Sequence, residues 1–157
     1  MRNGKISATL VLLTTVLASM AAQAGNLGVA ADLALPSGDF NKLYDSGFGI
    51  HAIFKRPLTP LVTLTADGGW TSFGQGDLGE LQDNPFGGDI DVWNVTAGGT
   101  VFLLPLGLGA EYGYFSKVED WSLVPYAGMG FGKLDLTVRY KATGDAKWWE
   151  FRVGVFF

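Results

Sequence analysis

The 157-residue chain contains no cysteine and a single histidine, His51. Without cysteine there can be neither a disulfide framework nor a thiolate metal site. One histidine excludes the multi-histidine sites of zinc enzymes. The net charge of −4 at pH 7 does not suit a nucleic-acid-binding surface, which is basic and clustered. We therefore expect no metal, no cofactor and no nucleic acid, and no motif in the chain predicts an enzyme.

Long apolar runs are scarce, and the one at the N-terminus is typical of a secretory signal peptide. Arg2 and Lys5 precede an apolar stretch at residues 8–20, and Ala22-Gln23-Ala24 supplies the small residues that signal peptidase reads. A spanning helix needs about 20 apolar residues, so this stretch is too short, although a retained N-terminal anchor is the alternative. We expect residues 1–24 to be removed and residues 25–157 to form one domain.

No later stretch could form a transmembrane helix, because the longest apolar run, at 101–108, contains proline and glycine. Such a chain can cross a bilayer only as a closed barrel, since open sheet edges leave backbone groups unsatisfied in lipid. The last ten residues have the pattern that a barrel strand requires: apolar residues alternate with Glu150 and Arg152. The apolar row at this end is Phe151, Val153, Val155 and Phe157.

The same alternation, interrupted by turns rich in Gly, Pro and Asp, divides the chain into eight strands. The predicted strands are 26–35, 47–55, 61–73, 91–103, 106–115, 122–131, 133–141 and 147–157. The longest connections, 36–46 and 74–90, are polar and lie at the same end, as do the extracellular loops of a bacterial barrel. We predict an all-β fold, an eight-stranded antiparallel up-and-down transmembrane β-barrel.

The face opposite the apolar rows carries nearly balanced charges. In the predicted barrel it lines a narrow interior, where unpaired charges are costly, so we expect a paired polar network that closes the barrel. Glu150 and Arg152 should pair with groups on the neighbouring first and seventh strands, such as Asp32, Asp135 or Arg139. A narrow ion path along these charges is the functional alternative. The expected lumen network comprises Asp32, His51, Lys55, Asp67, Glu111, Asp135, Arg139, Lys141, Glu150 and Arg152.

Periodicity alone does not decide which face points inward. A soluble lipocalin-like carrier would turn the apolar rows inward around an apolar ligand. However, the five tryptophans lie near the ends of strands joined by the longer loops, whereas Phe54, Phe102, Phe131 and Phe157 lie near the opposite ends. Two aromatic belts at the bilayer interfaces would give this distribution, which favours lipid outside.

The signal peptide, the eight short strands, the segment at 125–132 (PYAGMGFG) and the terminal Phe157 resemble the OmpA/OmpX-type family of small outer-membrane β-barrels. The resemblance implies a monomeric barrel in a Gram-negative outer membrane. It also implies that the row Phe151, Val153, Val155 and Phe157 is the signal read by the outer-membrane insertion machinery. Members differ widely in role, so the resemblance specifies architecture and not activity.

Two candidate sites remain. His51 is the only imidazole, and Asp67 on the neighbouring strand could orient it, as a lipid A-modifying enzyme would require. No serine lies within two residues of His51, and a histidine in the lumen network is the simpler interpretation. The acids of the second long loop could hold a divalent cation against lipopolysaccharide phosphates or contact an unknown protein partner. The candidate loop contacts are Asp77, Glu80, Asp83 and Phe86.

Together these patterns predict an integral outer-membrane protein with a closed polar lumen. Its expected role is structural or interactive, through contact of the extracellular loops with outer-membrane lipid, lipopolysaccharide or a protein. A small pore, a lipid A-modifying enzyme and a soluble carrier are the alternatives.

Overall fold

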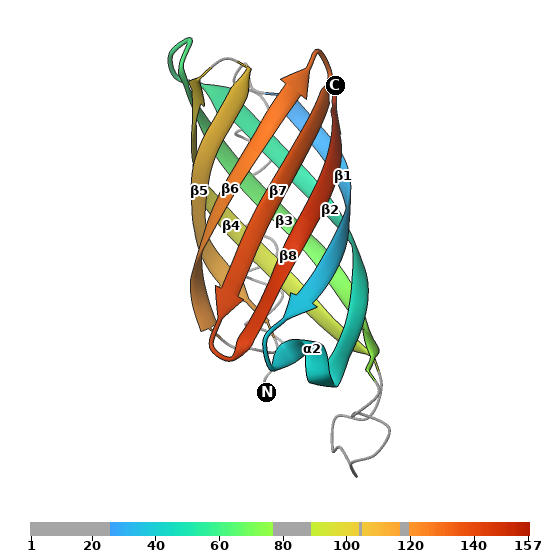
Figure 1. Ribbon diagram of the computed structural model, residues 1–157. Coiled ribbons are helices and arrows are strands. Elements are labelled where there is room, and N and C mark those ends of the chain that lie inside the picture. The colour runs from blue at the N-terminus through green and yellow to red at the C-terminus, as the bar shows by residue number, and fades with distance from the viewer. Residues whose placement is uncertain (1–25, 77–88, 104, 117–119) are drawn as a thin grey trace, which may run out of the picture.

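The computed structural model describes residues 26–76, 89–103, 105–116 and 120–157, and these form a single closed β-barrel (Figure 1). Each strand pairs antiparallel with its neighbours in sequence, and β1 pairs with β8 to close the barrel. The predicted eight-stranded antiparallel fold is thereby confirmed. The strands are β1 (Asn26–Ser37), β2 (Tyr44–Pro57), β3 (Val62–Gln75), β4 (Ile90–Leu103), β5 (Leu106–Phe115), β6 (Asp120–Phe131), β7 (Leu134–Thr143) and β8 (Ala146–Phe156).

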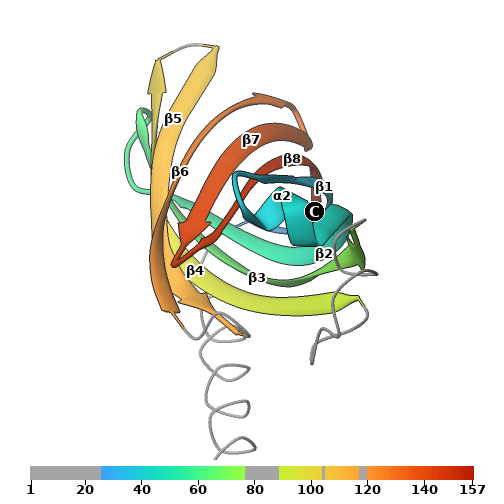
Figure 2. The ribbon, with the colours of Figure 1, turned by 60° about the horizontal axis from the view of Figure 1, so that its bottom comes forward.

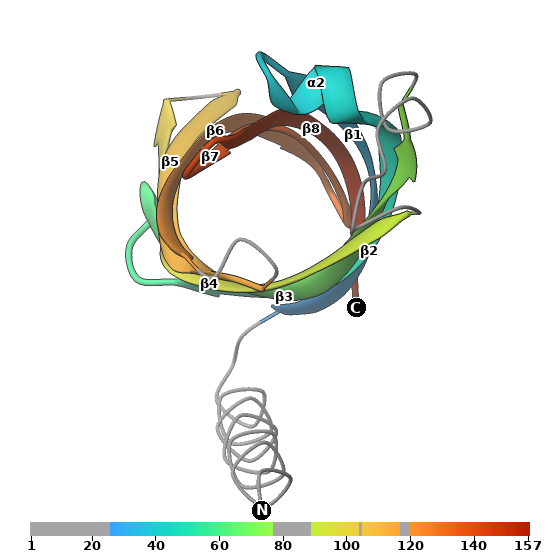
Figure 3. The ribbon, with the colours of Figure 1, turned by 90° about the horizontal axis from the view of Figure 1, so that it is seen from below.

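The barrel has two different ends. The short helix α2 (Phe40–Leu43) and the β7–β8 turn lie at one end, here called the α2 end, whereas the β2–β3 and β6–β7 turns lie at the other with the C-terminus (Figure 1). The tight turns of β6–β7 and β7–β8 contain Gly132 and Gly144 at φ 63° and 55°, a region that glycine adopts without strain. Viewed from below, the strands form a ring with α2 on its rim (Figure 3).

Alternating burial distinguishes the two faces of every strand. Along β8, buried and exposed residues alternate without a break, and Phe151, Val153 and Val155 are exposed. Apolar residues of the other strands are exposed in the same way, while the charged residues in the middle of the strands are buried. The alternative in which the apolar rows turn inward around a ligand is therefore wrong for this chain. Phe54 breaks the expected outer row, because it is only 2 % exposed beside the buried Ile53.

The strand ends differ from the prediction mainly at the α2 end. β1 continues to Ser37 and β2 begins at Tyr44, so the expected long loop at 36–46 is mostly strand plus α2. Within the described ranges, no helix is long and apolar enough to cross a membrane.

An aromatic cluster occupies the barrel interior at the α2 end. Phe40 of α2 packs on Phe73 and Trp148 with ring centroids 5.3 and 5.9 Å apart, and on Tyr44 at 4.8 Å. Figure 2 shows α2 held against the ends of β1, β2 and β8. Trp148 is fully buried in this cluster, so the prediction that all five tryptophans belong to outer aromatic belts is wrong for this residue. Side chains alternate between the two faces of a strand, and Trp148 stands at an inward position of β8, like Glu150 and Arg152.

The β6–β7 ladder is shorter than the others. Paired residues run from Tyr126 and Arg139 to Phe131 and Leu134, although both strands extend further toward the α2 end. Pro125, the residue of β6 just beyond the last pair, has no backbone N–H and cannot donate to a ladder. Beyond that point, the Ser122 hydroxyl donates a hydrogen bond to the Ala142 carbonyl across the two strands.

Candidate functional site: the charged interior

All ten side chains of the expected lumen network point into the barrel. They come from β1, β2, β3, β5, β7 and β8, at alternate positions that the strand period turns inward. Nine of the residues are buried, and the Lys55 side chain is 16 % exposed. The charges are thus gathered where water cannot screen them, and each must be compensated by a neighbour.

Two arginines connect the carboxylates. Arg152 on β8 contacts Asp67, lies 2.6 Å from Glu150 and 3.6 Å from Asp32, its partner in register on β1. Arg139 on β7 contacts Glu111 and lies 3.6 Å from Glu150, its partner in register on β8. A guanidinium has five N–H donors, so one arginine can serve several carboxylates at once.

Two lysines complete the network at opposite ends. Lys141 pairs with Glu150 and lies 5.4 Å from the Phe115 ring centroid and 5.7 Å from that of Trp148, so it links the ion network to the aromatic cluster. Lys55 pairs with Asp135, near the C-terminal end. β2 and β7 are not neighbours, so this pair crosses the lumen, whereas the sequence suggested Asp135 as a partner for β8.

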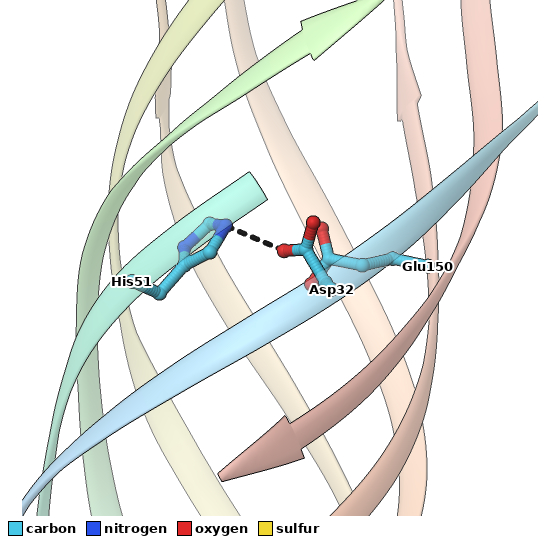
Figure 4. Close-up of side chains that lie close together, drawn as sticks. All are labelled: Asp32, His51 and Glu150. Atoms are coloured by element: carbon cyan, nitrogen blue, oxygen red, sulfur yellow. Dashed lines mark ion pairs between the residues drawn. The ribbon is translucent and has the colours of Figure 1, made fainter. Parts of the chain in front are cut away.

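His51 lies between two carboxylates. Its Nε2 is 2.6 Å from Asp32 Oδ2, and its Nδ1 is 3.1 Å from Asp67 Oδ1. Figure 4 shows the ring directed at Asp32, with Glu150 close by. The expected approach of Asp67 to His51 therefore occurs, but the second ring nitrogen also faces a carboxylate and not a hydroxyl nucleophile. The His51 side chain is wholly buried, so this arrangement does not suit catalysis.

Glycines make room for this cluster, and sequence reasoning missed them. A Cβ on Gly69 would lie 2.2 Å from His51 Nδ1, and a Cβ on Gly49 would lie 2.3 Å from Asp32 Oδ1. No larger residue fits at either position without displacing the charged groups. The signal available in the sequence was glycine at inward positions of strands two and three.

Neutral polar residues that the sequence did not single out as site residues also hold the network. Asn94 Nδ2 donates to Asp67 Oδ1 at 2.9 Å, and Thr96 donates to Glu111. The Tyr126 hydroxyl contacts the hydroxyls of Thr65 and Thr100. These contacts satisfy lone pairs and donors that the ion pairs leave open.

Oxygen and nitrogen atoms of Asp32, His51 and Glu150 lie within 4.8 Å of one another, close enough to surround a metal ion. Arg152 lies near both of these carboxylates, and Lys141 pairs with Glu150. A dication would lie close to these two cations and would be repelled by both of them. The electrostatics therefore oppose a metal at this position.

A small cavity lies within the described interior. A cavity of about 20 Å³ lies among Lys55, Glu111, Asp135, Arg139 and Arg152, toward the C-terminal end. This volume is enough for about one water molecule. Between Lys141 and the α2 end, the aromatic cluster fills the lumen.

The other sequence candidates lie away from this network. Asp77, Glu80, Asp83 and Phe86 fall outside the described residues. Of the predicted insertion row, Phe151, Val153, Val155 and Phe157 are all exposed on the outer face or at its end. Phe40 and Tyr44, expected on a loop surface, are buried in the aromatic cluster.

On the surface of the α2 end, Lys42 and Asp39 form an exposed ion pair at 2.6 Å. The hydrogen bond from Lys42, followed by its charge, lowers the pKa of Asp39, and the same contact raises the pKa of Lys42. Exposed pairs of this kind add little stability.

No protein-family model and no curated protein matches the sequence. Solved structures do match the fold. The barrel is similar to Ail, the attachment invasion locus protein of Yersinia pestis, with a TM-score of 0.55 and 18 % identity over 85 % of this chain and 97 % of Ail. Ail in complex with the heparin analogue sucrose octasulfate gives a TM-score of 0.53 and 17 % identity, over 85 % of this chain and 97 % of that one. A de novo designed transmembrane β-barrel gives 0.52 and 12 %, over 84 % and 95 %.

Proposed function

We propose that this protein is an integral outer-membrane β-barrel with a closed polar lumen, and that its role is structural or interactive and exercised at the α2 end. One observation carries the proposal. On all eight strands apolar side chains are exposed outward, and on six of them ionisable side chains are buried inside. Such a surface is stable in lipid and would aggregate in water.

The cellular setting follows from the sequence. We propose that residues 1–24 are a cleaved signal peptide, that residues 25–157 insert as an OmpA/OmpX-type monomer in a Gram-negative envelope, and that Phe151 to Phe157 guide the insertion machinery. The structural likeness to Ail supports the barrel fold on which this proposal rests, although the two chains share only 18 % identity.

A closed barrel accounts for the lumen better than a pore does. Each carboxylate of the network is within 4.0 Å of a cation, and the aromatic cluster fills the interior above Lys141. An ion moving along the barrel axis would have to break these carboxylate–cation pairs and displace Phe40 or Trp148. We therefore expect refolded protein to be electrically silent in planar bilayers.

A lipid A-modifying enzyme is also disfavoured. Both nitrogens of His51 are engaged by buried carboxylates, so the ring cannot activate a nucleophile at the membrane surface. We expect lipid A to be unchanged by expression of the protein.

The surface chemistry of the α2 end bears on its partner. Among described side chains at this end, the exposed charges are Asp39, Lys42, Asp45, Asp89, Asp91, Asp145 and Lys147. Acids predominate, so a sulfated ligand such as the heparin analogue bound to Ail does not suit this rim. Contact with lipopolysaccharide phosphates would need bridging cations. A protein partner at Asp77, Glu80, Asp83 and Phe86 remains a prediction.

Location and orientation can be tested with single cysteines, because the chain has none of its own. Asp145→Cys lies in the β7–β8 turn at the α2 end, and Lys133→Cys lies in the β6–β7 turn at the opposite end. A membrane-impermeant maleimide should label Asp145→Cys on intact cells and label Lys133→Cys only after the outer membrane is opened. The folded protein should also run faster on gels before boiling.

The control is a third variant, Val153→Cys, on the exposed outer face of β8. It should resist the aqueous reagent in both states, because lipid covers it. Labelling of Lys133→Cys on intact cells, or recovery of the protein in the soluble periplasmic fraction, would contradict the proposal.

A further inference from the structure

The buried charges of the described interior do not balance without His51. Asp32, Asp67, Glu111, Asp135 and Glu150 supply five carboxylates, whereas Lys55, Arg139, Lys141 and Arg152 supply four cations. The partly exposed pair of Lys55 and Asp135 is neutral by itself. The deeper set is therefore short of one positive charge, and an uncompensated buried carboxylate is costly.

His51 lies between two of these carboxylates. Nε2 lies 2.6 Å from Asp32 Oδ2, and Nδ1 lies 3.1 Å from Asp67 Oδ1. A neutral imidazole has one N–H and one lone pair, so in either tautomer a lone pair would face a carboxylate oxygen. Only the doubly protonated ring carries a positive charge and an N–H group at both nitrogens.

Asp67 is not the group that carries the additional proton needed for charge balance. Asn94 Nδ2 donates to Asp67 Oδ1, and the guanidinium of Arg152 donates to Oδ2. With His51 also at Oδ1, both oxygens already accept hydrogen bonds, which is the pattern of an ionised carboxylate. On the other side of the ring, Asp32 faces Arg152 at 3.6 Å.

We propose that His51 is an imidazolium that bridges Asp32 and Asp67, and that its proton is the positive charge that completes the ion network of the closed barrel. The charged groups around it come from every strand that packs there: Asp32 of β1, Asp67 of β3, Glu111 of β5, Arg139 and Lys141 of β7, and Glu150 and Arg152 of β8. The inference rests on the interior alone and does not depend on what the α2 end contacts.

The proposal makes the barrel sensitive to alkaline pH. While the ring is charged, its two ion pairs stabilise the folded state. Without the ring proton, one carboxylate faces a lone pair and the interior carries excess negative charge. The two ion pairs therefore stabilise the barrel only while the ring is protonated.

Nuclear magnetic resonance can read the charge state directly, because His51 is the only histidine of the chain. In ¹⁵N-labelled protein refolded in detergent micelles at about pH 7.5, where an unperturbed imidazole is mostly neutral, both ring nitrogens should carry protons. The urea-unfolded protein at the same pH is the internal control and should give a neutral ring. A neutral tautomer in the folded protein would overturn the proposal.

Asp32→Asn separates charge from packing. The substitution keeps the shape of the side chain and removes one carboxylate, so the deeper set then balances with a neutral His51. In this variant the folded ring should be neutral at about pH 7.5. If the ring of Asp32→Asn remains doubly protonated, the charge-balance argument is wrong.

Stability gives a second readout. The temperature at which the fast-migrating folded band disappears should fall for the native sequence between about pH 6 and about pH 9, and this fall should be absent in His51→Gln. Thr143→Val is the control, since Thr143 is a buried polar residue outside the ion network, and it should keep the native pH response. Equal responses of His51→Gln and the native sequence would refute a role for the ring charge. Should His51→Gln fail to fold, the spectra of the native protein decide the matter.

Discussion

Glu150→Gln is the sharpest test of the ion network. Glu150 is fully buried and contacts three cations: Lys141, Arg152 at 2.6 Å and Arg139 at 3.6 Å. The arginines also reach other carboxylates, whereas the other close contacts of the Lys141 ammonium are the rings of Phe115 and Trp148. Glutamine keeps the size of the side chain but leaves Lys141 as a buried cation without a nearby carboxylate.

Breaking a buried ion pair by neutralising one partner typically costs about 3–5 kcal/mol. We expect Glu150→Gln to lower the free energy of unfolding by about this amount, since Lys141 and Glu150 both have zero side-chain exposure. Lys141→Met should cost less, because Glu150 keeps both arginines. In the double variant the orphaned ammonium is gone, so its cost should fall below the sum of the two single costs by about 1–3 kcal/mol.

The assay is reversible urea unfolding of barrels refolded in phospholipid vesicles, followed by tryptophan fluorescence and by the folded band on gels. The native sequence, both single variants and the double variant form the cycle. A Glu150→Gln cost within about 1 kcal/mol, or strict additivity of the two substitutions, would refute the reasoning.

Three further substitutions test other parts of the structure in the same assay. Phe40→Ala should lower the free energy of unfolding by about 3 kcal/mol, because it opens the aromatic cluster. Leu43→Ala, on the same helix but 37 % exposed, should cost under about 1 kcal/mol, so equal costs would contradict the assignment of Phe40 to the barrel interior. Gly109→Ala should destabilise the barrel by about 1–3 kcal/mol, because its Cβ would lie 2.4 Å from Tyr126 Cζ and 2.6 Å from the backbone carbonyl of Gly99. Gly68→Ala, whose nearest contact is at 3.9 Å, should be nearly neutral, and an equally harmless Gly109→Ala would contradict the close packing at this position. Phe157→Ala should reduce the outer-membrane yield in cells without changing unfolding in vesicles, because Phe157 is 72 % exposed and lies beyond the last residue of β8. An unchanged yield would remove Phe157 from the proposed insertion signal.

The fold could be predicted from the sequence because strand periodicity is local. In each strand the alternation of polar and apolar residues indicates which side chains face inward and which face outward, as in β8 from Glu150 to Phe156. The turn glycines mark where strands end, and Gly132 and Gly144 do so with positive φ. Closure needed no further signal, since an antiparallel sheet in lipid must pair its first and last strands.

The composition of the interior was predictable for the same reason, but its pairing was not. Which cation meets which carboxylate depends on the register and stagger of strands that are distant in sequence. Asp135 illustrates the limit, because it pairs across the lumen with Lys55 of β2 and not with its neighbours on β8. The position of Asp32 on the far side of His51 depends in the same way on the β1–β2 register, and on Gly49 opposite Asp32.

The aromatic cluster shows where composition misleads. The segment at 36–46 is polar and rich in turn residues, so it was expected to be a long exposed loop. Only when β1, β2, β3 and β8 are assembled does Phe40 lie over Phe73 and Trp148, which are more than 70 residues apart in sequence. The ion network ends where these rings begin, at Lys141, whose ammonium contacts both Glu150 and the Trp148 ring. A mobile loop would have left that end of the network to water, whereas a packed cluster excludes water. The buried charges must therefore neutralise one another within the barrel, which is the reason that the protonation of His51 should matter to its stability.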